Sequence, residues 1–316
     1  LHLRLNNGFK GSYMTLSHCW GVSGEILKLT MDTYEDRLKN GFSYAELPKT
    51  FQDAIRLSRF LHIDYIWIDS LCIIQGSKED WMRESITMAD VYRHSKCNIA
   101  ATASSGPMEG CFYSRDPILI SSLEISFRRN DDESSSSPEK FLFLDNSIWN
   151  RNVEQAPLNQ RAWVMQERIL SPRQIHCGRE QLSWECYQAT ACETFPFSLD
   201  FGEDLSMESQ PLTVNGTRAT LEERIKHLKF KIYQDWMNIV TQYSSCALSY
   251  RSDKLVAIFG IASRIQDALK DLDEYVVGLW RSQLPWQLLW EVKWKKGHSS
   301  DDMAPSYDIG PSWSWA

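Results

Sequence analysis

The chain has 316 residues, 43% of them hydrophobic and 24% charged, with a formal net charge of −7. This composition predicts an ordinary soluble protein of one large or two smaller domains and excludes a general nucleic-acid-binding face. No apolar run approaches the roughly 18–20 residues that cross a bilayer. We therefore expect a cytoplasmic chain without a membrane span. Because it opens without Met, we expect it to be a piece of a longer polypeptide.

Patterns in the first half predict strands that alternate with helices. In chain order they are a strand over 13–20, a helix over 47–61, a strand over 63–68, a helix over 79–94 and a strand over 97–103. Continuous apolar strands are typical of sheets that are covered on both faces. This order predicts right-handed crossovers and an α/β, layered, mostly parallel sheet.

The remaining patterns predict a hairpin and then long helices. We expect a core domain over 1–178 and a mostly helical, Trp-rich half over 179–316, packed together as one compact unit. The other expected elements are a polar loop over 131–139, a strand over 141–144, a helix start within 159–170, a hairpin of 174–177 with 181–186, helices over 221–245 and 253–269, and an apolar stretch over 284–294.

The eight cysteines and thirteen tryptophans raise separate questions. The cysteines include no Cys-x-x-Cys, and the nearest cluster is Cys177, Cys186 and Cys192 beside His176. Structural zinc sites bring their ligands in close pairs, so we expect buried thiols and no metal or other cofactor. Most tryptophans are expected in the core, and a minority in an aromatic pocket.

Three segments place polar and aromatic side chains at the ends of predicted elements. They are Tyr13–Gly21, Trp67–Gln75 and Arg161–Glu167. Ligand sites of α/β folds lie outside the carboxyl ends of the strands. We therefore expect the three segments to converge on one pocket. The chain has no G-x-G-x-x-G and no Walker A sequence, which argues against a conventional dinucleotide fold or a kinase.

The candidate catalytic residues are His18, Asp69 and Glu167. A histidine titrates near neutral pH, and a carboxylate can act as acid or base. His18 could equally be a structural histidine bonded to backbone, or the partner of a nucleophilic Cys72. The candidate ligand-binding residues are Trp20, Trp67, Cys72, Gln75, Arg161, Trp163 and Gln166.

Both carboxylates also have a structural interpretation. A buried carboxylate must be paired, and Arg161 is the expected partner of Asp69. Glu167 could form an interior salt bridge with Arg168 or Arg173.

The chain resembles the fungal heterokaryon incompatibility (HET) domain family. Two departures are Gly76, where the family usually has Asp, and Ala162, where Gly is frequent. The resemblance covers nearly the whole chain and rests on Leu16–Gly21, Leu47–Ala54, Trp67–Gln75 with Asp80, Trp81, Met88, Val91 and Tyr92, then Arg161–Trp163 with Gln166, Glu167 and Ser171–Arg173, and on Asp253–Lys254, Gly278–Trp280, Leu288–Trp290 and Pro311–Ala316.

The resemblance implies a role in programmed cell death when genetically different fungal cells fuse. It also implies a TIR-like or flavodoxin-like core, and some TIR relatives cleave NAD. One hypothesis is therefore an effector that binds or cleaves a nucleotide. A second is a metal-free enzyme of fungal secondary metabolism that cyclises or isomerises an apolar terpenoid or polyketide in an aromatic pocket. A third is a non-enzymatic interaction module. The expected partner is a small molecule, nucleotide or apolar metabolite, and homo-oligomerisation is left open.

Overall fold

The chain divides into two compact units whose segments alternate along the sequence. The first comprises Leu1–Trp81, Val91–Gln160 and Ser171–Glu203, and the second comprises Met82–Asp90, Arg161–Leu170 and Asp204–Ala316. The predicted division at residue 178 stays a prediction. The computed structural model describes residues 1–6, 8, 10–21, 26–121, 123–127, 139–143, 145, 147–196, 213–214, 217–218, 221–291 and 310–316.

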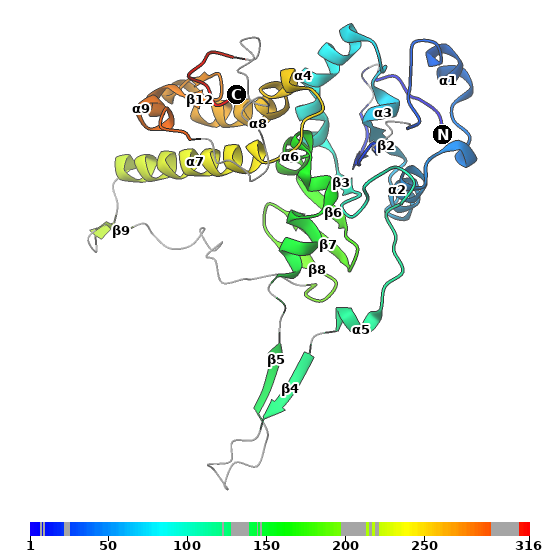
Figure 1. The fold of residues 1–316 in the computed structure, drawn as a ribbon, viewed down its shortest axis with the longest axis horizontal. Helices are drawn as coiled ribbons and strands as arrows, with labels where there is room; N and C mark the ends of the chain where they lie inside the picture. The colour runs from blue at the N-terminus through cyan, green and yellow to red at the C-terminus, as the bar shows by residue number, and fades with distance from the viewer. Residues whose placement is uncertain are drawn as a thin grey trace. The chain divides into compact units, whose positions relative to one another are not determined.

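A six-stranded sheet with the order β2-β1-β3-β6-β7-β8 forms the centre of the first unit (Figure 1). The strands β2, β1, β3 and β6 run parallel, and β7 and β8 continue the sheet antiparallel. The predicted α/β class with a mostly parallel sheet is therefore confirmed. The strands are β1 (Tyr13–Ser17), β2 (Tyr65–Ile68), β3 (Cys97–Ala100), β6 (Arg173–Cys177), β7 (Leu182–Cys186) and β8 (Thr190–Cys192).

The central strands are buried on both faces. On β1, Met14 and Leu16 are fully buried, and so are Thr15 and Ser17, which alternate with them. Asn98 of β3 connects this second set: its side chain accepts from Thr15 Oγ1 at 2.9 Å and donates to Ser17 Oγ at 2.9 Å. Buried polar groups need such partners. The network therefore holds β1 and β3 in one register.

The helices of the first unit follow from their apolar spacing and their caps. In α2, buried Phe51, Ala54, Ile55 and Ser58 lie on one face, as the 3.6-residue period requires. Ser77 caps α4 by accepting from Asp80 N at 3.2 Å. The helical elements are α1 (Tyr34–Asn40), η1 (Tyr44–Glu46), α2 (Lys49–Phe60), α3 (Asp69–Cys72), α4 (Lys78–His94, of which Met82–Asp90 belong to the second unit), α5 (Pro117–Ile120), η2 (Asn150–Glu154) and η3 (Pro157–Gln160).

A separate hairpin accounts for the strand expected at 141–144. Strands β4 (Leu123–Phe127) and β5 (Glu139–Phe143) pair antiparallel as a two-stranded sheet apart from the central one. Of the polar loop expected over 131–139, residues 131–138 lie outside the described part. The predicted hairpin around Gly178 is confirmed, because β6 and β7 pair antiparallel on either side of it.

The second unit is mostly helical. No helix in the described residues is both long and apolar enough for a bilayer crossing. The elements are α6 (Ala162–Leu170), β9 (Thr213–Val214), β10 (Thr217–Arg218), α7 (Leu221–Ser244), η4 (Arg251–Asp253), α8 (Val256–Leu269), η5 (Lys270–Leu272), β11 (Tyr275–Val276), β12 (Leu279–Trp280), η6 (Arg281–Gln283) and α9 (Leu284–Gln287).

The turn between β11 and β12 holds the last residues of the chain. Val277 and Gly278 both have positive φ, 45° and 94°, as the tightest hairpin turns require. The Gly278 carbonyl accepts from the indole nitrogens of Trp236 at 3.1 Å and Trp315 at 2.8 Å. The Val277 carbonyl accepts from Ser314 Oγ at 2.7 Å. The motif Ser314–Trp315 is thus docked onto one turn.

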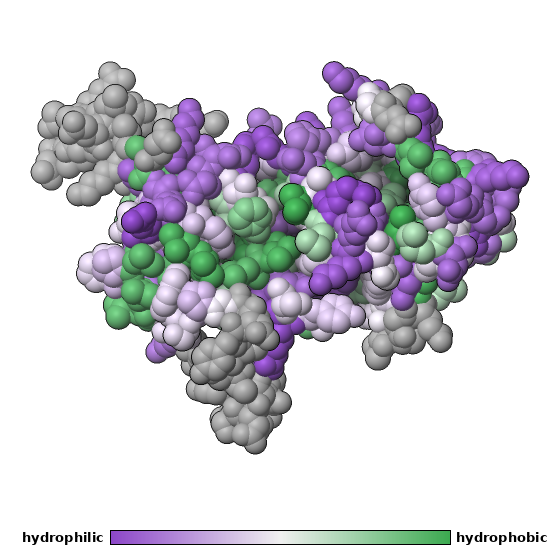
Figure 2. Space-filling view, turned by 90° about the horizontal axis from the view of Figure 1, so that it is seen from above, coloured by the Kyte–Doolittle hydropathy of each residue, from purple (hydrophilic) through white to green (hydrophobic). Residues whose placement is uncertain are grey.

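Other tryptophans lie on the surface. Trp286 and Leu289 are each 73% exposed, whereas Trp280 is fully buried. Figure 2 shows apolar side chains gathered on the face turned to the viewer, over the C-terminal elements at the left. The tryptophans of this half therefore divide between core and surface.

Candidate functional site

The first two sequence clusters meet at the carboxyl ends of β1 and β2. His18 and Trp20 follow the last residue of β1, and Asp69 follows the last residue of β2. The two strands are hydrogen-bonded neighbours, with Leu16 opposite Ile68. The expectation that His18, Trp20 and Asp69 come together is therefore met.

The Asp69 carboxylate is the centre of this group. Its Oδ2 accepts from Trp20 Nε1 at 3.0 Å, and its Oδ1 accepts from Ser70 N at 2.6 Å. The Nε2 atom of His18 lies 3.6 Å from Oδ1. The Asp69 side chain is nevertheless 25% exposed. A carboxylate fixed on one side and open on the other can accept hydrogen bonds from a ligand.

His18 occupies the interior side of the same group. The residue is 2% exposed, and its ring packs edge-on against Phe51 of α2, with the centroids 4.9 Å apart. It therefore contacts the carboxylate rather than solvent. In this arrangement Asp69, rather than His18, is the group that a ligand would meet.

Lys28 adds a positive charge that the sequence patterns do not indicate. Its ammonium nitrogen lies 5.3 Å from the centre of the Trp20 ring, a cation–π arrangement. Backbone bonds place the segment that carries it: Leu29 N donates to Ser70 O at 2.8 Å, and Gln75 N donates to Leu29 O at 2.7 Å. The site thus combines a carboxylate, an indole and an ammonium group.

Gln75 serves the backbone of the site. Its amide nitrogen donates to Ile73 O at 3.0 Å and to Asp69 O at 3.4 Å, so it holds the turn after α3. Gly76 has φ +85°, and no atom lies within 4 Å of the place a Cβ would take. An aspartate at this position would find room for its side chain, at the cost of a left-handed backbone.

The segment Leu47–Ala54 anchors the loop that follows β3. The side chain of Asp53, which is 1% exposed, accepts from Cys111 N at 2.9 Å and from Lys49 Nζ at 2.7 Å. Thr50 Oγ1 accepts from Gly110 N at 3.2 Å. One turn of α2 therefore supports Phe51 beneath His18 and also holds this loop.

Replacing Asp53 with alanine should lower the free energy of unfolding by about 2 kcal/mol, because the buried Cys111 N–H loses its acceptor. Asp53→Asn keeps an acceptor oxygen for Cys111 N and loses the ion pairs with half-exposed Lys49 and exposed Arg56, so about 1 kcal/mol is expected. Urea unfolding of both variants measures the difference. Equal losses of unfolding free energy in the two variants would show that the hydrogen bond from Cys111 N is not the main contribution of Asp53 to stability.

The third sequence cluster belongs to the second unit. Trp163 Nε1 donates to Asp253 Oδ2 at 3.4 Å, and Gln166 Oε1 accepts from Gly260 N at 2.9 Å. These contacts tie α6 to η4 and α8. The convergence of all three clusters on one pocket stays a prediction.

The remaining members of that cluster are placed as follows. Glu167 is 7% exposed. Arg161 is in a parallel bridge with Ala247, at the start of α6. The proposed pairing of Arg161 with Asp69 also stays a prediction, because the two residues belong to different units.

Trp67 and Cys72 both lie in the first unit, and their predicted role in ligand binding stays a prediction. The Trp67 ring packs edge-on against Tyr92, with the centroids 5.6 Å apart. Cys72 is the partly buried last residue of α3. The eight cysteines are present as thiols. Burial raises the pKa of the Cys97 thiol to about 12, as expected for a core cysteine.

A second histidine–carboxylate pair lies on β6 and β7. His176 Nε2 is 2.9 Å from Glu185 Oε2, and its Nδ1 is 3.2 Å from Thr102 Oγ1. His176 and Thr102 are fully buried, whereas the Glu185 side chain at the end of this row is 27% exposed. Across the described residues, no three His, Cys, Asp or Glu side chains are grouped as a metal site would need.

Two surface hollows are lined by residues outside the Asp69 group. One, of about 410 Å³, is lined by Glu35, Asp36, Leu38 and Lys39 of α1. The other, of about 320 Å³, lies on α7 and α8. Asp69 lines neither of them, and its partly exposed side chain lies at the ends of β1 and β2.

Comparison with known proteins agrees with the motifs. Residues 13–167 match the family model described as Heterokaryon incompatibility protein (HET). No curated protein and no solved structure matches the chain. The matched segment contains β1, α2, β2, α4 and β3 together with His18, Asp69 and Glu167. The match over residues 13–167 therefore assigns the chain to the heterokaryon incompatibility (HET) family.

Proposed function

We propose that this HET-family protein is a cell-death effector that binds a nucleotide of the NAD class at Asp69 and cleaves its nicotinamide–ribose bond. The observation that carries the proposal is the carboxylate itself. Asp69 is held by Trp20 and Ser70 N, lies beside buried His18, and keeps a quarter of its surface open.

Three neighbouring groups match three parts of such a nucleotide. A carboxylate accepts hydrogen bonds from ribose hydroxyls, an indole stacks on a flat heterocycle, and an ammonium group attracts phosphate. Asp69, Trp20 and Lys28 supply these groups. Their combination favours a ligand with a sugar, a ring and a negative charge.

The reaction would be hydrolysis: NAD⁺ and water give ADP-ribose, nicotinamide and a proton. As the bond to nicotinamide breaks, positive charge develops on the ribose. The negative charge of Asp69 would stabilise it, as fixed charges do in other active sites.

The order of the parallel strands supports the proposed TIR-like, flavodoxin-like core. Strands β2-β1-β3-β6 repeat the 2-1-3-4 order of flavodoxin-like sheets, in which ligands bind at the carboxyl ends. This is a fold-level analogy, and fold alone does not determine chemistry.

The two other hypotheses fit the site less well. A cyclase of an apolar terpenoid or polyketide needs a water-excluding aromatic cavity, whereas Asp69 and Lys28 place charges beside Trp20. An interaction module does not require a carboxylate, an indole and an ammonium group side by side, as Asp69, Trp20 and Lys28 supply them. We therefore place the nucleotide hypothesis first.

Calorimetric titration with NAD, nicotinamide riboside and ADP-ribose tests binding, and chromatography of the mixture measures nicotinamide release. Lys28→Ala should weaken NAD binding about tenfold and leave nicotinamide riboside, which has no phosphate, unchanged. If neither binding nor release occurs at any protein concentration, including conditions that force oligomers, the proposal is wrong.

A further inference from the structure

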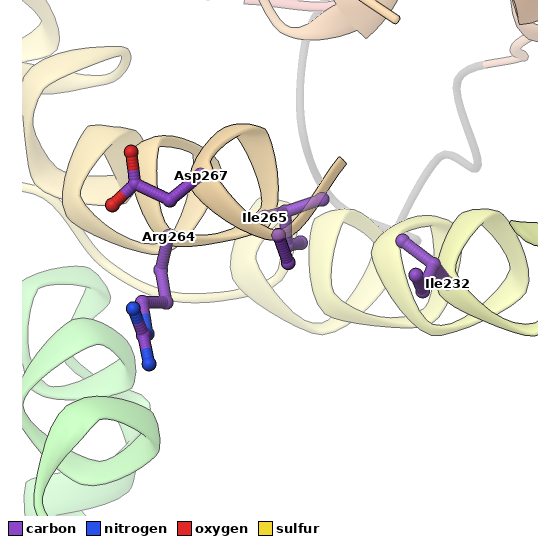
Figure 3. A pocket seen from close by; sticks show the side chains of 5 residues that line it. Ile232, Arg264, Ile265 and Asp267 are labelled. Carbon is purple, nitrogen blue, oxygen red and sulfur yellow. The ribbon is translucent and has the colours of Figure 1, made fainter. Parts of the chain in front are cut away.

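The hollow between α7 and α8 combines apolar and charged side chains, none of which takes part in the proposed nucleotide site. It has a volume of about 320 Å³ and lies within the second unit (Figure 3). Ile232 of α7 and Ile265 of α8 lie near each other, and Ala268 completes the apolar lining. Two charged residues of α8, Arg264 and Asp267, line it as well.

Arg264 and Asp267 are exposed, and neither forms an ion pair or hydrogen bond within the described residues. They are three residues apart on one helix, and Figure 3 shows their side chains pointing away from each other. Each therefore presents its charge outward beside the hollow. By contrast, Arg281 of the same unit lies 2.6 Å from Glu274.

The apolar part extends beyond the hollow along α7. Leu228, four residues before Ile232 and therefore on the same helical face, is 59% exposed. Burying an exposed leucine or isoleucine contributes about 1.5–3 kcal/mol at most. A partner that covered Leu228, Ile232 and Ile265 would gain this contribution while meeting one charge of each sign.

We propose that the occupant of this surface is a second copy of the chain, in a two-fold dimer in which Arg264 of each copy pairs with Asp267 of the other. In a two-fold interface the same patch faces itself, so every contact occurs twice. A patch with one cation and one anion is complementary to itself, and its charge is balanced although the whole chain carries −7. The apolar residues beside the charges, Ile232 and Ile265, are then covered by the partner copy.

Charge reversal tests this pairing on the full chain. Sedimentation of the wild type over a concentration series should show a dimer that weakens as salt rises, because exposed ion pairs are screened. Arg264→Asp and Asp267→Arg should each weaken dimerisation about tenfold or more, since each homodimer would then place like charges together. Arg59→Asp, an exposed change of the same charge on α2, is the matched control and should leave dimerisation unchanged.

Mixing the two reversed variants is the decisive measurement. One copy then carries two aspartates and the other two arginines, so every cross-pair is again of opposite sign. We expect the mixture to regain the wild-type association while each variant alone remains mostly monomeric. A wild type that stays monomeric, a dimer that survives either reversal, or a mixture that does not regain association would each overturn the proposal.

Discussion

Replacing Gly278 with alanine is expected to lower the free energy of unfolding by about 3 kcal/mol and to release the last residues of the chain. Two effects add. The residue has φ +94°, which side-chain-bearing residues rarely adopt, and a Cβ would lie 2.6 Å from Trp315 Nε1 and 2.9 Å from Trp315 Cε2. Because the indole is rigid, either Trp315 or the turn must move. Urea unfolding measures the loss, and limited proteolysis reports the release.

Gly76→Ala separates the two effects. Gly76 has φ +85°, but no atom lies within 4 Å of the new Cβ, so only the backbone cost of about 1 kcal/mol is expected. The difference between the variants then reports the contact with Trp315. Equal losses would contradict the docking of Trp315 on this turn.

The hydrogen bond from Trp315 Nε1 to Gly278 O joins the Ser-Trp-Ser-Trp segment to the Gly-Leu-Trp segment almost forty residues earlier. Gly278 O accepts from Trp236 and Trp315, and Lys254 Nζ donates to Trp315 O at 2.9 Å. A carbonyl that accepts two indole N–H groups loses both if the turn shifts. The Gly-Leu-Trp and Ser-Trp-Ser-Trp segments therefore form one structural feature.

Local patterns predicted most of the first unit because its strands are continuous buried runs. β1, β2, β3 and α2 lie within the predicted stretches, and α4 begins one residue before its predicted start. The polar network of Asn98 could not be predicted, because its partners come from strands far apart in the sequence. The separation of β4 and β5 from the central sheet is likewise a matter of long-range pairing.

In the candidate site, too, the sequence predicted the residues that directly follow strands but not those placed by long-range contacts. His18, Trp20 and Asp69 were predictable because each follows a strand directly, and parallel neighbours end at the same edge. Lys28 was not, because its place depends on backbone bonds of Leu29 with residues about forty positions away. Gln75 has the right position in sequence, but its amide is used by the backbone of its own turn.

Replacing Asp69 with asparagine is expected to weaken binding of NAD, and equally of nicotinamide riboside, about 10- to 100-fold. The substitution keeps the shape of the side chain and one acceptor oxygen, but it removes the negative charge and one acceptor for ribose hydroxyls. Ser70 N at 2.6 Å retains a partner in the amide oxygen, whereas Trp20 Nε1 loses its acceptor, so a loss of about 1 kcal/mol in the free energy of unfolding is expected. Calorimetry gives the affinity, and unfolding in urea checks the fold.

Asp64→Asn is the matched control, since Asp64 immediately precedes β2 and Asp69 immediately follows it. The two variants change the same charge at opposite ends of one strand, so a general loss of negative charge would affect both equally. Asp69→Asn should affect both ligands, whereas Lys28→Ala should affect only the one with phosphate. This contrast places the ribose at Asp69 and the phosphate at Lys28. Unchanged affinity in Asp69→Asn, with NAD still bound by the wild type, would mean that the ligand contacts another surface and that Asp69 only holds β1 to β2.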